Sequence, residues 1–141
     1  MRIVLDASAA MHAITKSSFG DLIRSSLMQA DQVLAPILYH AEISNGLLKY
    51  VKAGHLSIKD AEDKLDESLR FITEFHSIED LKYDVLHEAN RLNHSVYDIH
   101  YLVLVKRYGA HLMTFDKRLL ALARQEELRY IQFEEIDWDW E

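Results

Sequence analysis

Four acidic residues, Asp6, Glu42, Asp98 and Asp116, are the side chains of this sequence that are best placed to do chemistry. Asp6 ends the apolar run IVL, and Asp116 lies just past the run HLMT, so each is predicted to follow a buried strand. Glu42 comes early in the helix predicted after VLAP, and Asp98 begins the predicted helix DIHYLVLVKRY. Because ligands of an open parallel sheet bind beyond the carboxyl ends of its strands, we expect all four acids to face one edge.

Each acid, taken alone, also has an ordinary structural explanation. Asp98 and Asp116 could cap the helices that follow them, and Glu42 could be an exposed helix residue. Four carboxylates on one edge are harder to explain in this way, because without a counter-charge they repel one another and partly protonate. A hard divalent cation, Mg²⁺ or Mn²⁺, takes oxygen ligands and removes this repulsion. We therefore predict a divalent metal site formed by these four residues, with Asp6 and Asp98 as its core ligands.

Three neutral polar residues are placed where they could orient these acids. Ser8 comes two residues after the first acid, Thr114 comes two residues before the last, and Asn45 lies one helical turn after the glutamate. Basic residues near the same edge could contact a nucleic-acid backbone. They are Lys49, Lys52, Lys117 and Arg118. Lys49 is better explained as a solvated surface lysine than as a phosphate contact.

Several common catalytic sites are absent from the sequence. There is no cysteine, and the eight histidines show no HExxH spacing, which argues against a zinc site. The chain also lacks GxGxxG, the P-loop lysine motif and the GxSxG elbow of serine hydrolases.

Strand and helix patterns alternate along the chain. Strands are predicted at 2–5, 32–36, 75–78, 110–114 and 129–133, and helices at 18–28, 37–51, 58–75, 81–92, 98–108 and 117–126. Ser57 is a good N-cap for the third of these helices, and Gly109 is a good stop for the fifth. This alternation predicts an α/β fold whose sheet is mainly parallel and flanked by helices on both faces.

The composition is that of a globular protein. A chain of 141 residues predicts one domain spanning 1–141. No apolar run is long enough to span a membrane and no signal peptide is evident, so we expect a cytoplasmic protein without a membrane partner. A net charge of −7 argues against a protein that coats nucleic acid nonspecifically. It is compatible with an enzyme whose acidic site is neutralised by bound cations.

The segments VLDASAA, AEISNGLLK, YDIHYLVLV and LMTFDKRLLALA occur in the order and spacing of PIN-domain proteins. In length and motifs the chain resembles the VapC-type toxins of toxin–antitoxin pairs. The resemblance implies a PIN-like three-layer fold and a Mg²⁺- or Mn²⁺-dependent endoribonuclease that hydrolyses RNA. The family's acidic metal-binding set matches Asp6, Glu42, Asp98 and Asp116. It further implies a homodimer, held inactive by a cognate antitoxin protein.

The sequence departs from the family pattern in two places. His100 and bulky aliphatics occupy a segment where small residues are common, and the C-terminal segment EEIDWDWE is unusually acidic and aromatic. Three other classes fit the sequence less well. An aspartyl-phosphate phosphatase would need an acid at the position of Ser8, and a receiver domain would need paired acids and a strand-terminal lysine. A non-catalytic PIN-fold module that binds RNA or protein remains the main alternative.

Overall fold

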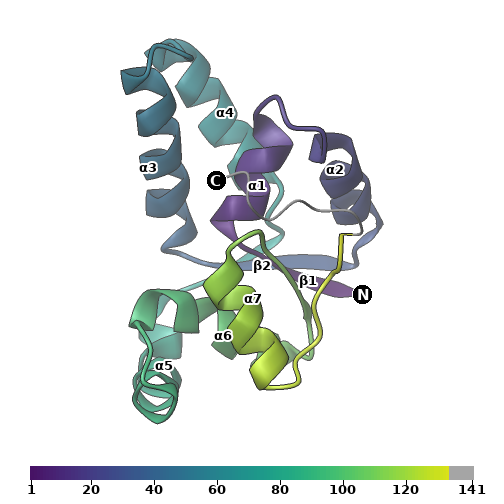
Figure 1. Cartoon of the computed structure of the whole chain (residues 1–141), viewed down its shortest axis with the longest axis vertical. Helices are drawn as coiled ribbons and strands as arrows, with labels where there is room; N and C mark the ends of the chain where they lie inside the picture. The colour runs from purple at the N-terminus through teal and green to yellow at the C-terminus, as the bar shows by residue number, and fades with distance from the viewer. Residues whose placement is uncertain (134–141) are drawn as a thin grey trace.

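A sheet of four parallel strands forms the centre of the molecule (Figure 1). The computed structural model describes residues 1–133, so the segment EEIDWDWE lies outside the described residues. The strands are β1 (Arg2–Leu5), β2 (Gln32–Pro36), β3 (Glu74–His76) and β4 (His111–Met113), in the spatial order β3-β2-β1-β4. In the register, Ile3 lies opposite Val33 on one side and His111 on the other. The order makes β1 a central strand, buried as its apolar run predicts.

Seven helices are present within residues 1–133. They are α1 (Ala7–Ile14), α2 (Gly20–Gln29), α3 (Tyr39–Lys52), α4 (Ile58–Arg70), α5 (Ile78–Leu92), α6 (Val96–Tyr108) and α7 (Lys117–Gln125). The helices α1 to α4 cover one face of the sheet, and α5 to α7 cover the other (Figure 1). The predicted α/β fold with a parallel sheet between two helical layers is confirmed. Within this part of the chain, no helix is long and apolar enough to cross a membrane.

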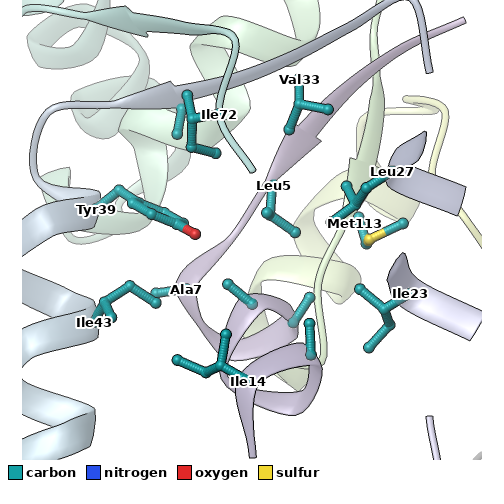
Figure 2. Packing of buried hydrophobic residues seen from close by; sticks show 14 of the residues in the cluster. Leu5, Ala7, Ile14, Ile23, Leu27, Val33, Tyr39, Ile43, Ile72 and Met113 are labelled. Atoms are coloured by element: carbon teal, nitrogen blue, oxygen red, sulfur yellow. The ribbon is translucent and has the colours of Figure 1, made fainter. Parts of the chain in front are cut away.

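The alternation of side chains along β1 divides the core between the two layers. Ile3 and Leu5 point into the cluster under α1 to α4, whereas Val4 points into the cluster under α5 to α7. In the first cluster, Leu5 lies with Met113 of β4 and Ile23 of α2 (Figure 2). Because the side chains of β1 are buried on both faces of the sheet, the carboxyl end of the strand has a fixed position.

Two sequence predictions about elements were wrong. Residues 129–133 form no strand; only a single bridge joins Tyr130 to Leu112, because the segment runs beside a strand of three residues. The helix α1 was not predicted, since its eight residues ASAAMHAI are too few to show a period and no side chain caps them.

The end of α4 and the start of α6 also differ from the prediction. The helix α4 begins after its predicted cap Ser57 but ends at Arg70, because Thr73 already pairs with β2 through Val33. The helix α6 begins at Val96, two residues before Asp98, because Ser95 is its cap. Asp98 therefore lies inside the first turn of α6 and is not the cap.

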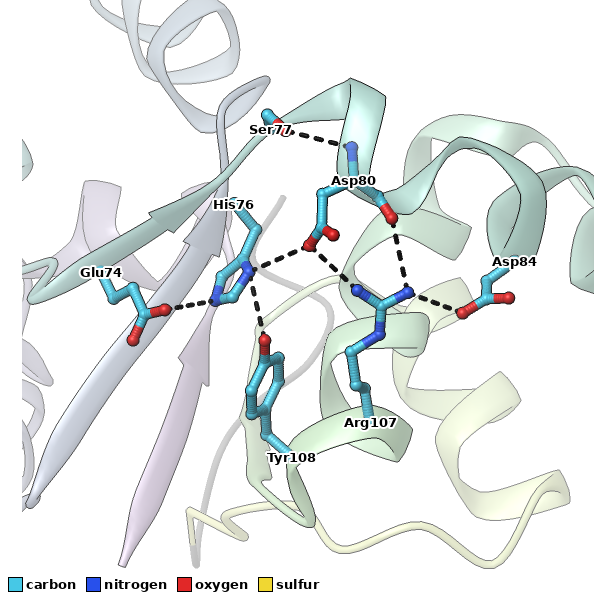
Figure 3. Close-up of polar contacts among 7 residues, drawn as sticks. All are labelled: Glu74, His76, Ser77, Asp80, Asp84, Arg107 and Tyr108. Atoms are coloured by element: carbon cyan, nitrogen blue, oxygen red, sulfur yellow. Dashed lines mark hydrogen bonds and ion pairs between the residues drawn. The ribbon is translucent and has the colours of Figure 1, made fainter.

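Polar contacts fix the far end of α6 against β3 and α5 (Figure 3). Arg107 donates to Asp80 at 3.0 Å and to Asp84 at 2.7 Å, both on α5. His76, at the end of β3, lies 3.6 Å from Asp80 and 3.5 Å from the hydroxyl of Tyr108. These contacts hold the helix that carries Asp98 at its other end.

Candidate active site

The carboxyl ends of β1 and β4 lie side by side and form the edge predicted from the sequence. The backbone N–H of Asp6 donates to the carbonyl of Met113 at 3.0 Å, which extends the parallel pairing by one bond. Asp6 and Thr114 are thereby brought together although 108 residues separate them. We call this edge, with Asp6, Glu42, Asp98 and Asp116, the acidic edge.

Two hydroxyl groups hold the carboxylate of Asp6. Its Oδ2 accepts hydrogen bonds from Ser8 Oγ and from Thr114 Oγ1, each at 2.6 Å. The two hydroxyls are themselves held by backbone amides. Phe115 N donates to Ser8 at 3.0 Å, and Asp116 N donates to Thr114 at 2.9 Å. Each hydroxyl therefore has its proton directed at Asp6, and the carboxylate is fixed in one orientation.

The environment of Asp6 disfavours its charge. The side chain is only 5% exposed. Burial raises the pKa of Asp6 to about 6, the hydrogen bonds from Ser8 and Thr114 act in the opposite direction, and the charges of Asp116 and Asp98 raise it further. A buried acid that is opposed by other acids is the arrangement that a bound cation would relieve.

Glu42 lies in the first turn of α3, near enough to the other three acids for their charges to act on it. Its Oε1 accepts a hydrogen bond from the hydroxyl of Tyr101 at 2.7 Å. Burial raises the pKa of Glu42 to about 7; the bond from Tyr101 lowers it, and the charges of Asp6, Asp98 and Asp116 raise it. Glu42 can therefore gain or lose a proton near neutral pH.

Asp98 and Asp116 complete the acidic edge from α6 and α7. Burial raises the pKa of Asp98, the charge of Asp116 adds to this, and His94 and Arg118 oppose it. His94 Nε2 lies 3.8 Å from Asp98 Oδ2. Oδ1 of Asp116 accepts from the amides of Arg118 at 2.8 Å and Leu119 at 3.0 Å. Asp116 is thus the N-cap of α7, one of the roles expected from the sequence. Its charge also raises the pKa of the other three acids.

The four acids interact electrostatically, but within residues 1–133 no three His, Cys, Asp or Glu side chains are spaced to coordinate a single ion. The donors themselves are hard carboxylate oxygens, which suit Mg²⁺ or Mn²⁺. Mg²⁺ is commonly bound through one or two carboxylates while it keeps several waters. The donor chemistry of the acidic edge therefore fits a divalent ion held partly through water.

Comparison with known proteins decides the family. The family model described as PIN domain matches residues 3–125. The chain belongs to the PIN domain family.

Two relatives of this PIN domain come from Pyrobaculum aerophilum. The chain is 27% identical over 121 residues to a protein named Ribonuclease VapC3, covering 84% of this chain and 92% of that protein. It is also similar in structure to PAE2754, whose crystal structure gives a TM-score of 0.68 at 22% identity, covering 86% of this chain and 78% of that one. The second likeness supports the fold alone.

A groove runs from the acidic edge of the PIN domain between α1 and α3. Its volume is about 300 Å³, and it is lined by Ser8 and Asp116 at one end and by Lys49 and Tyr50 further along. We call it the α1–α3 groove. Of the predicted basic contacts, Lys49 thus lines a path to the acids, and Arg118 lies near enough to lower the pKa of Asp98. Lys52 and Lys117 are exposed.

Asn45 is not joined to the acids by a hydrogen bond in the described part of the chain, and it is exposed on α3. Its predicted role in orienting Glu42 stays a prediction. The sequence reasoning missed Tyr101, which holds Glu42 instead. One signal was available: Tyr101 follows Asp98 by three residues, a spacing that places both on one face of a helix.

Proposed function

We propose that this PIN domain is a Mg²⁺- or Mn²⁺-dependent endoribonuclease of the VapC type, which hydrolyses phosphodiester bonds of RNA. The observation that carries the proposal is Asp6, a buried acid fixed by Ser8 and Thr114 and raised in pKa by burial and by neighbouring acids. Stability alone does not call for such a group, because burying like charges costs free energy. The relative named Ribonuclease VapC3 supports the same activity.

Each residue of the acidic edge would have its own role in metal binding or proton transfer. Asp6 and Asp98 would be the principal ligands of the ion, and Asp116 would add its free oxygen directly or through water. Ser8 and Thr114 would keep Asp6 in its binding orientation. Glu42, with a pKa of about 7, would accept the proton of the attacking water. When bound, Mg²⁺ would supply a water of lowered pKa and neutralise charge at the leaving oxygen.

The test is cleavage of a labelled RNA by the purified full chain. We expect no cleavage in EDTA, cleavage when Mg²⁺ or Mn²⁺ is added back, and products that show internal cuts. Cleavage that persists unchanged in EDTA would disprove the metal dependence. Binding of RNA without cleavage at any metal concentration would favour the alternative of a non-catalytic module. The lack of a ready-made three-ligand cluster within residues 1–133 is the observation that keeps this alternative open.

We further propose that the protein is the toxin of a toxin–antitoxin pair and that a basic antitoxin segment inhibits it. An arginine can bind carboxylates through two hydrogen bonds and stays charged at physiological pH. It would occupy the acidic edge in competition with the cation. Calorimetric titration of a cognate antitoxin should therefore show weaker binding when Mg²⁺ is raised at constant ionic strength. An affinity that does not respond to Mg²⁺ would place the inhibitory contact elsewhere.

A homodimer is part of the same proposal. Exposed apolar side chains on α2, Leu22 at 51% and Met28 at 86%, offer a surface for a second copy. Light scattering should give twice the monomer mass of 16.4 kDa. A constant monomer mass across a wide concentration range would contradict it.

A further inference from the structure

A pocket near the end of the α1–α3 groove has a charge opposite to that of the chain. It is lined by Thr15, Lys16, Tyr50, His55, Leu56 and Lys64, with a volume of about 320 Å³. We call it the basic pocket. Among residues 1–133 no acidic residue lines it, although the chain has 23 acidic residues against 16 lysines and arginines. A cationic pocket on an acidic protein concentrates anions there.

The basic pocket continues the α1–α3 groove, because Thr15 and Tyr50 line both. One concave path therefore leads from Asp116 at the acidic edge to Lys16 beyond the end of α1. Figure 1 shows α1 running away from the sheet beside α3, with α4 behind them. The path follows about eight residues of α1 and its end, or roughly 12 Å at 1.5 Å per residue. Roughly three stacked nucleotides at about 3.4 Å each cover this length.

The polar groups of the pocket are partly fixed. Lys64 Nζ donates to the carbonyl of Ile14 at 2.7 Å, which anchors the ammonium at the C-terminal end of α1. An ammonium has three N–H donors, so two remain available for a ligand. Within residues 1–133, no ion pair joins Lys16 or Lys64 to an acid, so no described carboxylate neutralises either charge. The ring of Tyr50 lies edge-on to His55 at 6.3 Å between centroids and is 37% exposed.

We propose that the basic pocket binds a backbone phosphate of single-stranded RNA a few nucleotides from the bond at the acidic edge, and that Tyr50 stacks on an intervening base. The inference rests on the proposed function, because it extends the path of the same substrate. Lysines supply the charge that a phosphate needs, and the exposed ring of Tyr50, which lines both the basic pocket and the α1–α3 groove, supplies a stacking face. Together they would position the RNA strand along the α1–α3 groove.

The test measures binding in EDTA, where cleavage is not required. The probe is a fluorescein-labelled, unstructured RNA octamer, and the readout is its affinity as a function of salt. In Lys16→Ala/Lys64→Gln, the slope of log affinity against log salt should fall by about 0.7, the value for one phosphate contact on a single strand. Lys82→Ala, an exposed lysine on α5 outside both cavities, is the control for net charge and should keep the parent slope. Lys64→Gln keeps a donor for Ile14, and thermal melting confirms folding.

The stacking role has its own pair of variants. Tyr50→Leu should weaken octamer binding about tenfold, whereas Tyr50→Phe should keep it, because stacking needs the ring and not the hydroxyl. Unchanged salt slopes and affinities in all pocket variants, with a parent that binds and cleaves RNA, would overturn the pocket and leave the proposed function standing. A parent that neither binds nor cleaves RNA would instead overturn the proposed function. If the variants lose binding of a hexaglutamate peptide but keep that of RNA, the pocket is a site for acidic protein segments and the inference is wrong.

Discussion

The protein treats its acidic residues in two opposite ways. On the face of α5 and α6, Glu88 accepts from Arg91 and from Lys106, each at 2.5 Å, and Arg91 and Lys106 also pair with Glu126. The hydrogen bond from Arg91, followed by that from Lys106, lowers the pKa of Glu88 to about 2. At the acidic edge, burial raises the pKa of Asp6 to about 6 and that of Glu42 to about 7.

The difference lies in the neighbours and not in the residue type. Glu88 is partly exposed and pairs with two cations, whereas Asp6 is buried, is held by two neutral hydroxyls, and has Asp116 and Asp98 as the charges that act on it. An acid that is paired with cations, such as Glu88, is stable in its charged form without a ligand. A buried acid without such a partner, such as Asp6, destabilises the folded state when it is charged, and a bound cation can offset that cost. The contrast separates acids that stabilise the fold through ion pairs from the acids to which the proposed function assigns metal binding and proton transfer.

The largest expected effect is on catalysis. Asp98→Asn should lower RNA cleavage about a thousandfold at saturating Mg²⁺, because metal ligation contributes several kcal/mol to the transition state. Glu88→Gln also replaces a carboxylate by an amide, but in the ion-pair cluster with Arg91 and Lys106, and it should cleave at the parent rate. The rates of both purified variants, measured on one RNA, check this. Equal losses in the two variants would remove the distinction between the two regions.

The second effect is on stability as a function of pH, and the two regions should show opposite signs. The folded pKa of Asp6 lies above its ordinary value of 3.8, so the folded state binds more protons between pH 4 and 6. The free energy of unfolding of the metal-free protein should therefore fall as pH rises through this window, by at most about 3 kcal/mol at 1.36 kcal/mol per unit. Glu42 extends the fall to about pH 7.

Glu88 should behave in the reverse sense. Its folded pKa of about 2 lies below its ordinary 4.5, so the stability it contributes is present above pH 4.5 and is lost as pH falls toward 2. Urea unfolding in EDTA at a series of pH values measures both effects. Asp6→Asn should make the profile less steep between pH 4 and 6, where Glu42 still contributes, and Glu88→Gln should make it less steep below 4.5. A profile of Asp6→Asn that overlays the parent would mean that Asp6 carries no such cost.

The third effect is stabilisation by the metal itself. A cation at a hundred times its dissociation constant adds about 2.7 kcal/mol to the free energy of unfolding. Mg²⁺ or Mn²⁺ should raise the melting temperature of the parent by several degrees at pH 7.5, and Asp98→Asn should lose this increase. Glu88→Gln should keep it. The same increase in Asp98→Asn would show that the ion binds away from the acidic edge.

The smallest effect concerns Tyr101. Tyr101→Phe removes a hydrogen bond that lowers the pKa of Glu42, so that pKa should rise by up to about one unit, for a bond to a charged group worth about 1.5 kcal/mol. The pH–rate profile of cleavage should then move to higher pH, while the folded structure is kept. Tyr83→Phe, an exposed tyrosine on α5, serves as the matched control. A profile that does not move would leave Tyr101 a purely structural residue.

The parts of the site that could be predicted are those whose position follows from strand ends. Asp6 and Thr114 were placed together because runs buried on both faces, each followed by a polar residue, indicate parallel strands that end at one edge. The contact between Glu42 and Tyr101 could not be predicted in this way. It joins two helices across 59 residues and depends on how α3 and α6 pack on opposite faces of the sheet.

Local chemistry decided the remaining differences. The helix α1 lacks a cap and has only eight residues, so its pattern was too short to be informative, and α6 begins at Ser95 because a serine there accepts from the amide of Tyr97. The grouping of the four acids as metal ligands depends on side-chain distances that no pattern of residues reports, and it stays a prediction.

The pairing of β1 with β4 determines when the acidic edge can form during synthesis on the ribosome. Asp6 is synthesised 108 residues before its partner Thr114, so Thr114 leaves the exit tunnel much later. Contacts so distant along the chain form late and slowly. A nascent chain that already exposes Asp6 therefore lacks the neighbour that orients it. Under the proposed function, nuclease activity would appear only once β4 has formed, so an unfinished copy could not attack the message from which it is being translated.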